Sequence, residues 1–166
     1  MNPIKRLVIH CSDSAFGNAA LIDQWHRQRG FSKIGYHFVI LNGYPDSRQY
    51  QNRKPWNFLD GTVECGRNLD TDPYLSEEEV GAHVYGFNQE SIGICLIGGK
   101  SGFTSRQFHT LRELVNELLD NFHLPISAVF GHYELNQDKT CPDINMEDLR
   151  RYLADDHIKP LLNQEG

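Results

Sequence analysis

Apolar and polar positions along the chain follow two different patterns, and short apolar runs form the first. Residues 7–9 are a β-branched-rich run that stops before the polar Ser12, which predicts a buried strand over 6–11. The nearly continuous apolar stretch 91–98 predicts a central strand buried on both faces. Shorter aromatic or β-branched runs predict three further strands, over 35–41, 61–65 and 128–130.

Apolar residues spaced three and four apart form the second pattern, which predicts helices. The longest repeat follows Thr104, which can form a capping box with Gln107 ahead of seven apolar positions. An earlier repeat ends before Gly30, a residue favoured just beyond a helix end, and predicts a helix over 19–29. A last helix is predicted over 146–154, after an irregular loop over 131–145.

Strands that alternate with helices indicate an α/β fold with a central mixed β-sheet flanked by α-helices. A chain of 166 residues is long enough to bury one core, so we expect a single domain over 1–166. Residues 42–60 carry two prolines, three basic residues and four aromatic residues between two predicted strands. This composition predicts a surface insert.

Charge and hydropathy exclude several classes of protein. With 16 basic and 22 acidic residues, the formal charge of -6 argues against nucleic acid as the main partner. No apolar run approaches the roughly 20 residues needed to span a bilayer, and the first residues lack the apolar core of a signal peptide. We therefore expect a cytoplasmic protein with no membrane insertion and with reduced cysteines.

Two of the eight histidines, His10 and His132, are candidate ligands because each directly follows an apolar strand and precedes a polar loop. Cys141 follows His132 by nine residues and precedes Pro142, a spacing that is not a metal signature by itself. From the residues alone, Cys141 is therefore either a ligand or incidental. Four other histidines are expected to pack, to face solvent or to lie in the tail, namely His26, His109, His123 and His157.

A series of short motifs carries a family resemblance. In chain order they are Gln24-Trp25-His26, Gly35-Tyr36-His37-Phe38, Gly61-Thr62-Val63, Val80-Gly81-Ala82-His83, Gly86-Phe87-Asn88, Ser91-Ile92-Gly93-Ile94-Cys95-Leu96, Gly131-His132 and Cys141-Pro142. Their order over residues 6–153 resembles that of the type 2 N-acetylmuramoyl-L-alanine amidases. This family includes phage lysozymes, which the chain resembles most, and the animal peptidoglycan recognition proteins.

The resemblance implies a zinc site. The family's three Zn²⁺ ligands fall on His10, His132 and Cys141. Two imidazoles and one thiolate leave the fourth tetrahedral position open, as in a catalytic site. Animal members that only bind the cell wall lack the metal cysteine, so Cys141 favours an enzyme over a binding protein.

The resemblance also implies catalytic and substrate-binding residues. The family's catalytic tyrosine and lysine fall on Tyr36 and Lys139, which could donate hydrogen bonds to the oxyanion of a tetrahedral intermediate. His83 and Asn88 fall where the family lines its substrate groove. Without the family match, Tyr36 would be read as a strand-end residue and Lys139 as an exposed loop charge.

The implied activity is zinc-dependent hydrolysis of the amide bond between N-acetylmuramic acid and L-alanine in bacterial peptidoglycan. An endolysin of a phage or prophage would act as a monomer and remain in the cytoplasm until a holin releases it to the cell wall. Two alternatives stay open. A cytosolic amidase would recycle anhydro-muropeptides, whereas a non-catalytic protein would bind peptidoglycan without cleaving it.

Three departures from the phage lysozymes of the family bear on these expectations. The interval from His132 to Cys141 is one residue longer, which affects the reach of Lys139. The insert over 42–60 either lengthens the substrate groove or is surface decoration. The segment before the first strand is shorter, and in a phage relative that segment helps to restrain the phage RNA polymerase, so a polymerase-regulating role is not implied.

Overall fold

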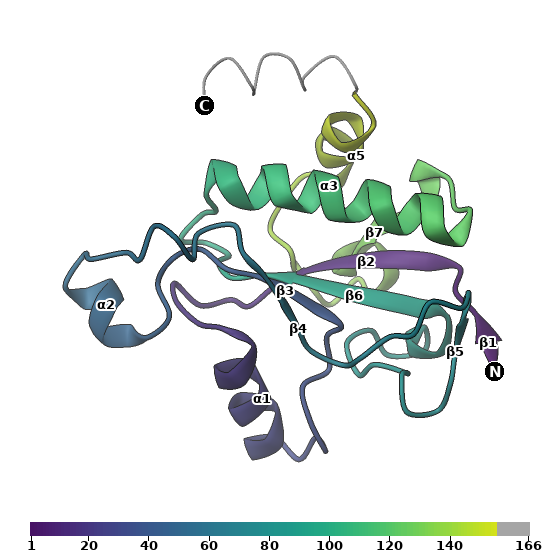
Figure 1. The fold of residues 1–166 in the computed structure, drawn as a ribbon, viewed down its shortest axis with the longest axis horizontal. Helices are drawn as coiled ribbons and strands as arrows, with labels where there is room; N and C mark the ends of the chain where they lie inside the picture. Colours follow the sequence, from purple (N-terminus) through teal and green to yellow (C-terminus); the bar gives the residue numbers. More distant parts are fainter. Residues whose placement is uncertain (156–166) are drawn as a thin grey trace.

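A five-stranded mixed sheet forms the centre of the protein, with the strand order β4-β3-β6-β2-β7 (Figure 1). The computed structural model describes residues 1–155. Strands β3, β6, β2 and β7 are parallel to one another, and β4 pairs antiparallel with β3 at one edge. The strands are β2 (Arg6–Cys11), β3 (Phe38–Ile40), β4 (Val63–Cys65), β6 (Ser91–Leu96) and β7 (Val129–Gly131).

Helices cover both faces of this sheet. Figure 1 shows α3 and α5 on one side and α1 on the other. The helices are α1 (Ala19–Gln28), α2 (Ser47–Gln51), α3 (Ser105–Phe122), α4 (His132–Leu135) and α5 (Met146–Ala154), with short 3-10 turns η1 (Asn88–Glu90) and η2 (Ile126–Ala128). Within residues 1–155 no helix is long and apolar enough to cross a membrane.

Alternation along the strands divides the core into two clusters. Leu7 and Ile9 of β2 belong to the larger cluster, beneath α3 and α5. Cys95 of β6 belongs to the smaller cluster, which includes Ile22 of α1. His10 is in register with Cys95 and therefore lies on the α1 face of the sheet. The fold thus places one polar ring at the end of a buried strand.

Most predicted elements are confirmed, and the exceptions have local causes. The strand over 6–11 and the helix over 146–154 have the predicted bounds, whereas β3 begins only at Phe38. Gly35 sits so close to the backbone of Ala82 that any side chain would collide, which places it at a crossing of two loops. The loop over 131–145 was wrongly predicted to be irregular throughout, because it begins with helix α4.

A second, two-stranded sheet was not predicted. It pairs β1 (Asn2–Pro3) antiparallel with β5 (Tyr74–Leu75). Two-residue strands leave no periodic pattern in a sequence, so only the folded chain reveals them.

The capping box predicted at the start of α3 is present. The Thr104 hydroxyl accepts from Gln107 N–H at 3.1 Å, and the Gln107 side chain accepts from Thr104 N–H at 2.9 Å. We expect Thr104→Ala to lower the free energy of unfolding by about 1–2 kcal/mol, because it removes the oxygen that caps the helix. Urea denaturation measures this difference. Thr104→Ser keeps the oxygen and should lose much less, so equal losses in the two variants would contradict the capping role.

Candidate active site

Three side chains that could hold a metal ion meet at one end of the sheet and form what we call the metal-ligating group. His10 is near the carboxyl end of β2, His132 directly follows β7, and Cys141 lies in the next loop. Their donor atoms all lie within 4.8 Å of one another. This is the only such group of three or more His, Cys, Asp or Glu residues found within residues 1–155. Because β2 and β7 are parallel neighbours, their carboxyl ends bring the first two ligands together.

The donor set fits a tetrahedral zinc ion. Bond lengths to zinc near 2.0–2.3 Å place neighbouring ligand atoms roughly 3.3–3.8 Å apart. Nδ1 of His10 lies 3.9 Å from Sγ of Cys141, close to this spacing. The ring centroids of His10 and His132 are 4.7 Å apart at 67°, so the two imidazoles approach edge to face. Small side-chain adjustments are enough to close the set around an ion.

The Cys141 sulfur is held by the backbone around it. Cys11 N–H donates to Sγ of Cys141 at 3.1 Å, and Tyr133 N–H donates to the Cys141 carbonyl at 2.9 Å. An N–H group aimed at sulfur favours the thiolate form. The contact with the Cys11 thiol, followed by burial, nevertheless raises the pKa of the Cys141 thiol. A bound cation would therefore be what favours the thiolate.

The two imidazoles are kept neutral. Burial, and then the neighbouring His83 and His132, lower the pKa of His10 well below its ordinary value. Burial, and then the charge of Lys139, lower the pKa of His132. Both rings are thus uncharged at neutral pH, which is the form that binds a metal.

Tyr36 lies against the metal-ligating group. Its ring centroid is 5.0 Å from that of His10 and 5.3 Å from that of His26. Burial raises the pKa of Tyr36 well above its ordinary value. The phenol therefore stays protonated over the working range of an enzyme and can act as a hydrogen-bond donor.

Lys139 lies in the loop between His132 and Cys141. Its side chain is exposed, and its N–H donates to the carbonyl of Asn136 at 3.1 Å. Its positive charge contributes to the lowered pKa of His132. Helix α4 and the turn that follows it occupy the interval between His132 and Cys141.

His83 and Asn88 both make hydrogen bonds to other parts of the protein. The His83 ring is buried and lies between His10 and the carbonyl of Ser91. Asn88 Oδ1 accepts from the N–H groups of His83 and Val84, each at 2.8 Å. These hydrogen bonds already occupy the His83 ring and the Asn88 side-chain oxygen. Contact of the two residues with substrate stays a prediction.

Three other histidines are not among the predicted ligands. The His26 ring is buried, and its Nδ1 accepts from Gly35 N–H at 2.9 Å. His109 is partly exposed beside Glu113, and His123 ends α3 in a left-handed conformation. The expected packing or solvent roles of these three are confirmed. His157 lies outside the described residues.

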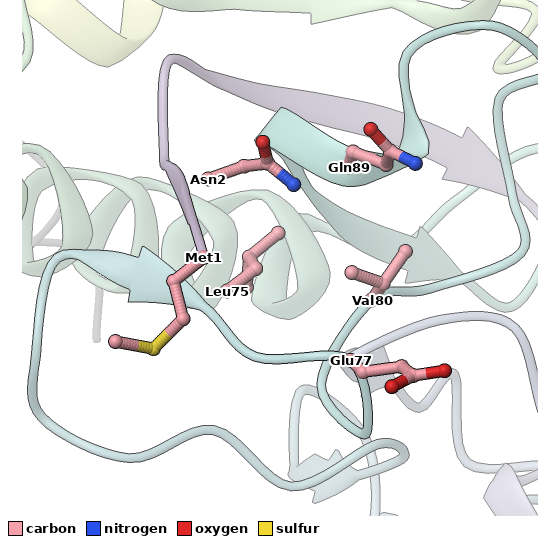
Figure 2. A pocket seen from close by; sticks show the side chains of 6 residues that line it. All are labelled: Met1, Asn2, Leu75, Glu77, Val80 and Gln89. Carbon is pink, nitrogen blue, oxygen red and sulfur yellow. The ribbon is translucent and has the colours of Figure 1, made fainter.

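A shallow pocket of about 390 Å³ lies beside the two-stranded sheet (Figure 2). It is lined by Met1, Asn2, Leu75, Glu77, Val80 and Gln89. Glu77 is its only titratable side chain, so the pocket offers fewer candidate catalytic groups than the metal-ligating group does. The group around His10 remains the candidate active site.

Comparison with known proteins decides the family. The family model described as N-acetylmuramoyl-L-alanine amidase matches residues 1–144. The chain belongs to this family. The endolysin of Escherichia phage T7 is 32% identical over 151 residues, which cover 85% of this chain and 82% of that protein. The predicted likeness to phage lysozymes, and the assignment as an amidase, are thus confirmed.

Two solved structures share the fold. The amidase LysC from Clostridium intestinale URNW has a TM-score of 0.69 and 25% identity, and the match covers 92% of this chain and 86% of LysC. A complex of peptidoglycan recognition proteins LCa and LCx with tracheal cytotoxin has a TM-score of 0.61 and 26% identity, covering 86% of this chain and 77% of that chain. The predicted mixed sheet with flanking helices is confirmed.

Proposed function

We propose that this amidase is a zinc-dependent endolysin. It hydrolyses the bond between the lactyl group of N-acetylmuramic acid and L-alanine in bacterial peptidoglycan. The observation that carries the proposal is the convergence of His10, His132 and Cys141, with donor atoms within 4.8 Å, in a chain of the amidase family. The endolysin assignment is supported by the phage relatives.

The ligand chemistry supports catalysis over a purely structural metal site. Two imidazoles and one thiolate leave one tetrahedral position open. When bound, zinc supplies Lewis-acid chemistry, which activates water near neutral pH and polarises the amide carbonyl. His10, His132 and Cys141 would hold the ion, and their neutral rings and enclosed sulfur suit that task.

Two further side chains would act on the reacting amide. The Tyr36 phenol would donate a hydrogen bond to the oxyanion of the tetrahedral intermediate, since it stays protonated next to His10. The Lys139 ammonium, which is exposed and acts electrostatically on His132, would stabilise the same negative charge. Hydrolysis adds water across the bond and leaves a lactyl carboxylate and the amine of L-alanine.

The proposal extends to the domain organisation, the oligomeric state and the location of the protein. The chain would be a single zinc amidase domain that acts as a monomer on peptidoglycan or muropeptides, and it would stay in the cytoplasm until it is released to the wall. Residues 42–60 are mostly exposed, and Trp56 and Phe58 stack there with ring centroids 5.9 Å apart. Such a surface would suit sugar rings if the insert lengthens the substrate groove.

Mass spectrometry of digested peptidoglycan tests the proposal most directly. We expect the zinc-loaded protein to release stem peptides that begin with a free L-alanine amine, with the lactyl carboxylate left on the glycan. New reducing sugar ends, or cuts inside the stem peptide, would contradict the proposed bond. Binding to the wall without any released peptide would instead identify a non-catalytic protein.

A parallel digest distinguishes the two enzymatic readings. Intact sacculi and small anhydro-muropeptides are supplied separately at matched concentrations. Release from sacculi supports an endolysin, whereas activity confined to the fragments would replace it with a recycling amidase.

A further inference from the structure

A buried imidazole, His83, lies behind the metal-ligating group. Its Nδ1 is 2.8 Å from Nε2 of His10, and its Nε2 is 3.3 Å from the carbonyl oxygen of Ser91. His10 in turn directs its Nδ1 toward Cys141, at 3.9 Å from the sulfur. A carbonyl, an imidazole and a metal-ligating imidazole therefore form one line of contacts across the end of the sheet.

The direction of every hydrogen bond in this line follows from the carbonyl at its end. The Ser91 carbonyl can only accept, so Nε2 of His83 must carry a proton. Nδ1 of a neutral His83 is then a bare acceptor, and Nε2 of His10 must donate to it. In a neutral His10 this leaves Nδ1 unprotonated, with its lone pair on the side of Cys141.

Two glycines hold the His83 ring in this place. A Cβ atom at Gly93 would lie 2.7 Å from Cγ of His83, and one at Gly81 would lie 2.7 Å from its Cδ2. Gly93 belongs to the buried strand β6, so the ring packs directly against the backbone of the sheet. The ring cannot move toward either glycine, which restricts its orientation as well as its hydrogen bonds.

Asn88 fixes the backbone that carries His83. Its Oδ1 accepts from the N–H groups of His83 and Val84, each at 2.8 Å, so one side chain closes the turn. The segment before His83 is held separately, since Ala82 N–H donates to the carbonyl of Gly35 at 3.0 Å. The position of His83 is thus determined by contacts on both sides of it.

We propose that His83 is a positioning residue that sets the tautomer and ring orientation of His10, so that Nδ1 of His10 is presented to the metal. This inference rests on the proposed zinc site. Hydrogen-bonded partners of metal-ligating histidines act in this way in other proteins, and their loss commonly weakens metal binding by about 10–100-fold. The role differs from substrate contact, for which a side chain that is buried and bonded at both ring nitrogens is poorly placed.

The test compares His83→Asn with His83→Leu. These two side chains have nearly the same shape, and both lose the contact with Ser91, but only asparagine places an oxygen where Nδ1 of His83 now accepts. We expect His83→Leu to bind Zn²⁺ about 10–100-fold more weakly than the parent protein, and His83→Asn to recover most of that loss. Competition with a chelator of known affinity measures both values without any assay of activity.

A second measurement reads the His10 ring itself. Nitrogen-15 NMR of the metal-free protein should show a proton on Nε2 and none on Nδ1 of His10 in the parent protein and in His83→Asn. The ring should exchange between tautomers in His83→Leu. Urea denaturation of the metal-free variants reports whether both remain folded.

The outcomes separate this inference from the proposed function. Equal zinc affinity in the two variants, whether lowered or unchanged, would overturn the role of His83 while leaving the zinc site in place. A proton on Nδ1 of His10 in the parent protein would overturn it as well. A parent protein that binds no zinc would instead remove the proposed function on which the inference rests.

Discussion

Replacing Cys141 with alanine is expected to abolish release of stem peptides while the domain stays folded. The sulfur is one of three donors within 4.8 Å, and alanine leaves only two imidazoles to hold the ion. We expect activity to fall by more than about 10³-fold, beyond the 10–100-fold typical of residues that merely support a ligand. Peptide release at saturating zinc measures the loss of activity. The zinc content after dialysis measures the loss of the ion.

The chain offers a matched control for this substitution. Cys65 is an exposed free cysteine on β4, the edge strand of the sheet, so Cys65→Ala removes a thiol without touching the metal-ligating group. It should retain both zinc and activity. If Cys141→Ala released peptides as fast as Cys65→Ala, the thiolate would have no place in the site.

The second large effect is expected for Tyr36→Phe. The substitution keeps the ring beside His10 and removes only the hydroxyl. Losing one preorganised donor to an oxyanion typically costs about 10²–10³-fold in kcat. Zinc affinity should stay within about threefold of the parent protein, because the phenol is not one of the three ligands. Steady-state kinetics and chelator competition separate the two quantities.

Tyr74→Phe is the corresponding control. Tyr74 is exposed on β5, which pairs with the N-terminal strand β1 in the small sheet. Its hydroxyl should contribute nothing to kcat. A Tyr36→Phe enzyme that kept its kcat but lost zinc would show that Tyr36 supports the ligands and does not act on the substrate.

The strongly patterned parts of the fold could be predicted from the sequence. The apolar run at residues 7–9 predicted β2, and the capping box at Thr104 predicted the start of α3. Both features could be predicted because burial and helix capping each require particular residue types within a few positions of one another. Helix α4 and the strands β1 and β5 could not be predicted. They span only two to four residues each, which is too short to leave a periodic pattern of apolar positions.

The candidate site could likewise be predicted only in part from the sequence. Position at a strand end singled out His10 and His132, but only the family resemblance singled out Cys141, since its spacing from His132 is not distinctive. The contact of Cys11 with Cys141 joins residues 130 positions apart, and that of His10 with His83 joins residues 73 positions apart. No local pattern records contacts of this kind. Gly81 and Gly93 were a signal available in the sequence, but their meaning depends on the ring packed against them.

The three donors stand at positions 10, 132 and 141, so they join the first main strand to the last third of the chain. A growing polypeptide cannot assemble the full donor set until residue 141 has been synthesised, and any shorter fragment lacks it. An ion bound only by the finished fold stabilises that fold by mass action and ties together two ends of a long loop. The proposed zinc site, and any activity that depends on it, would therefore arise only after residue 141 has been added.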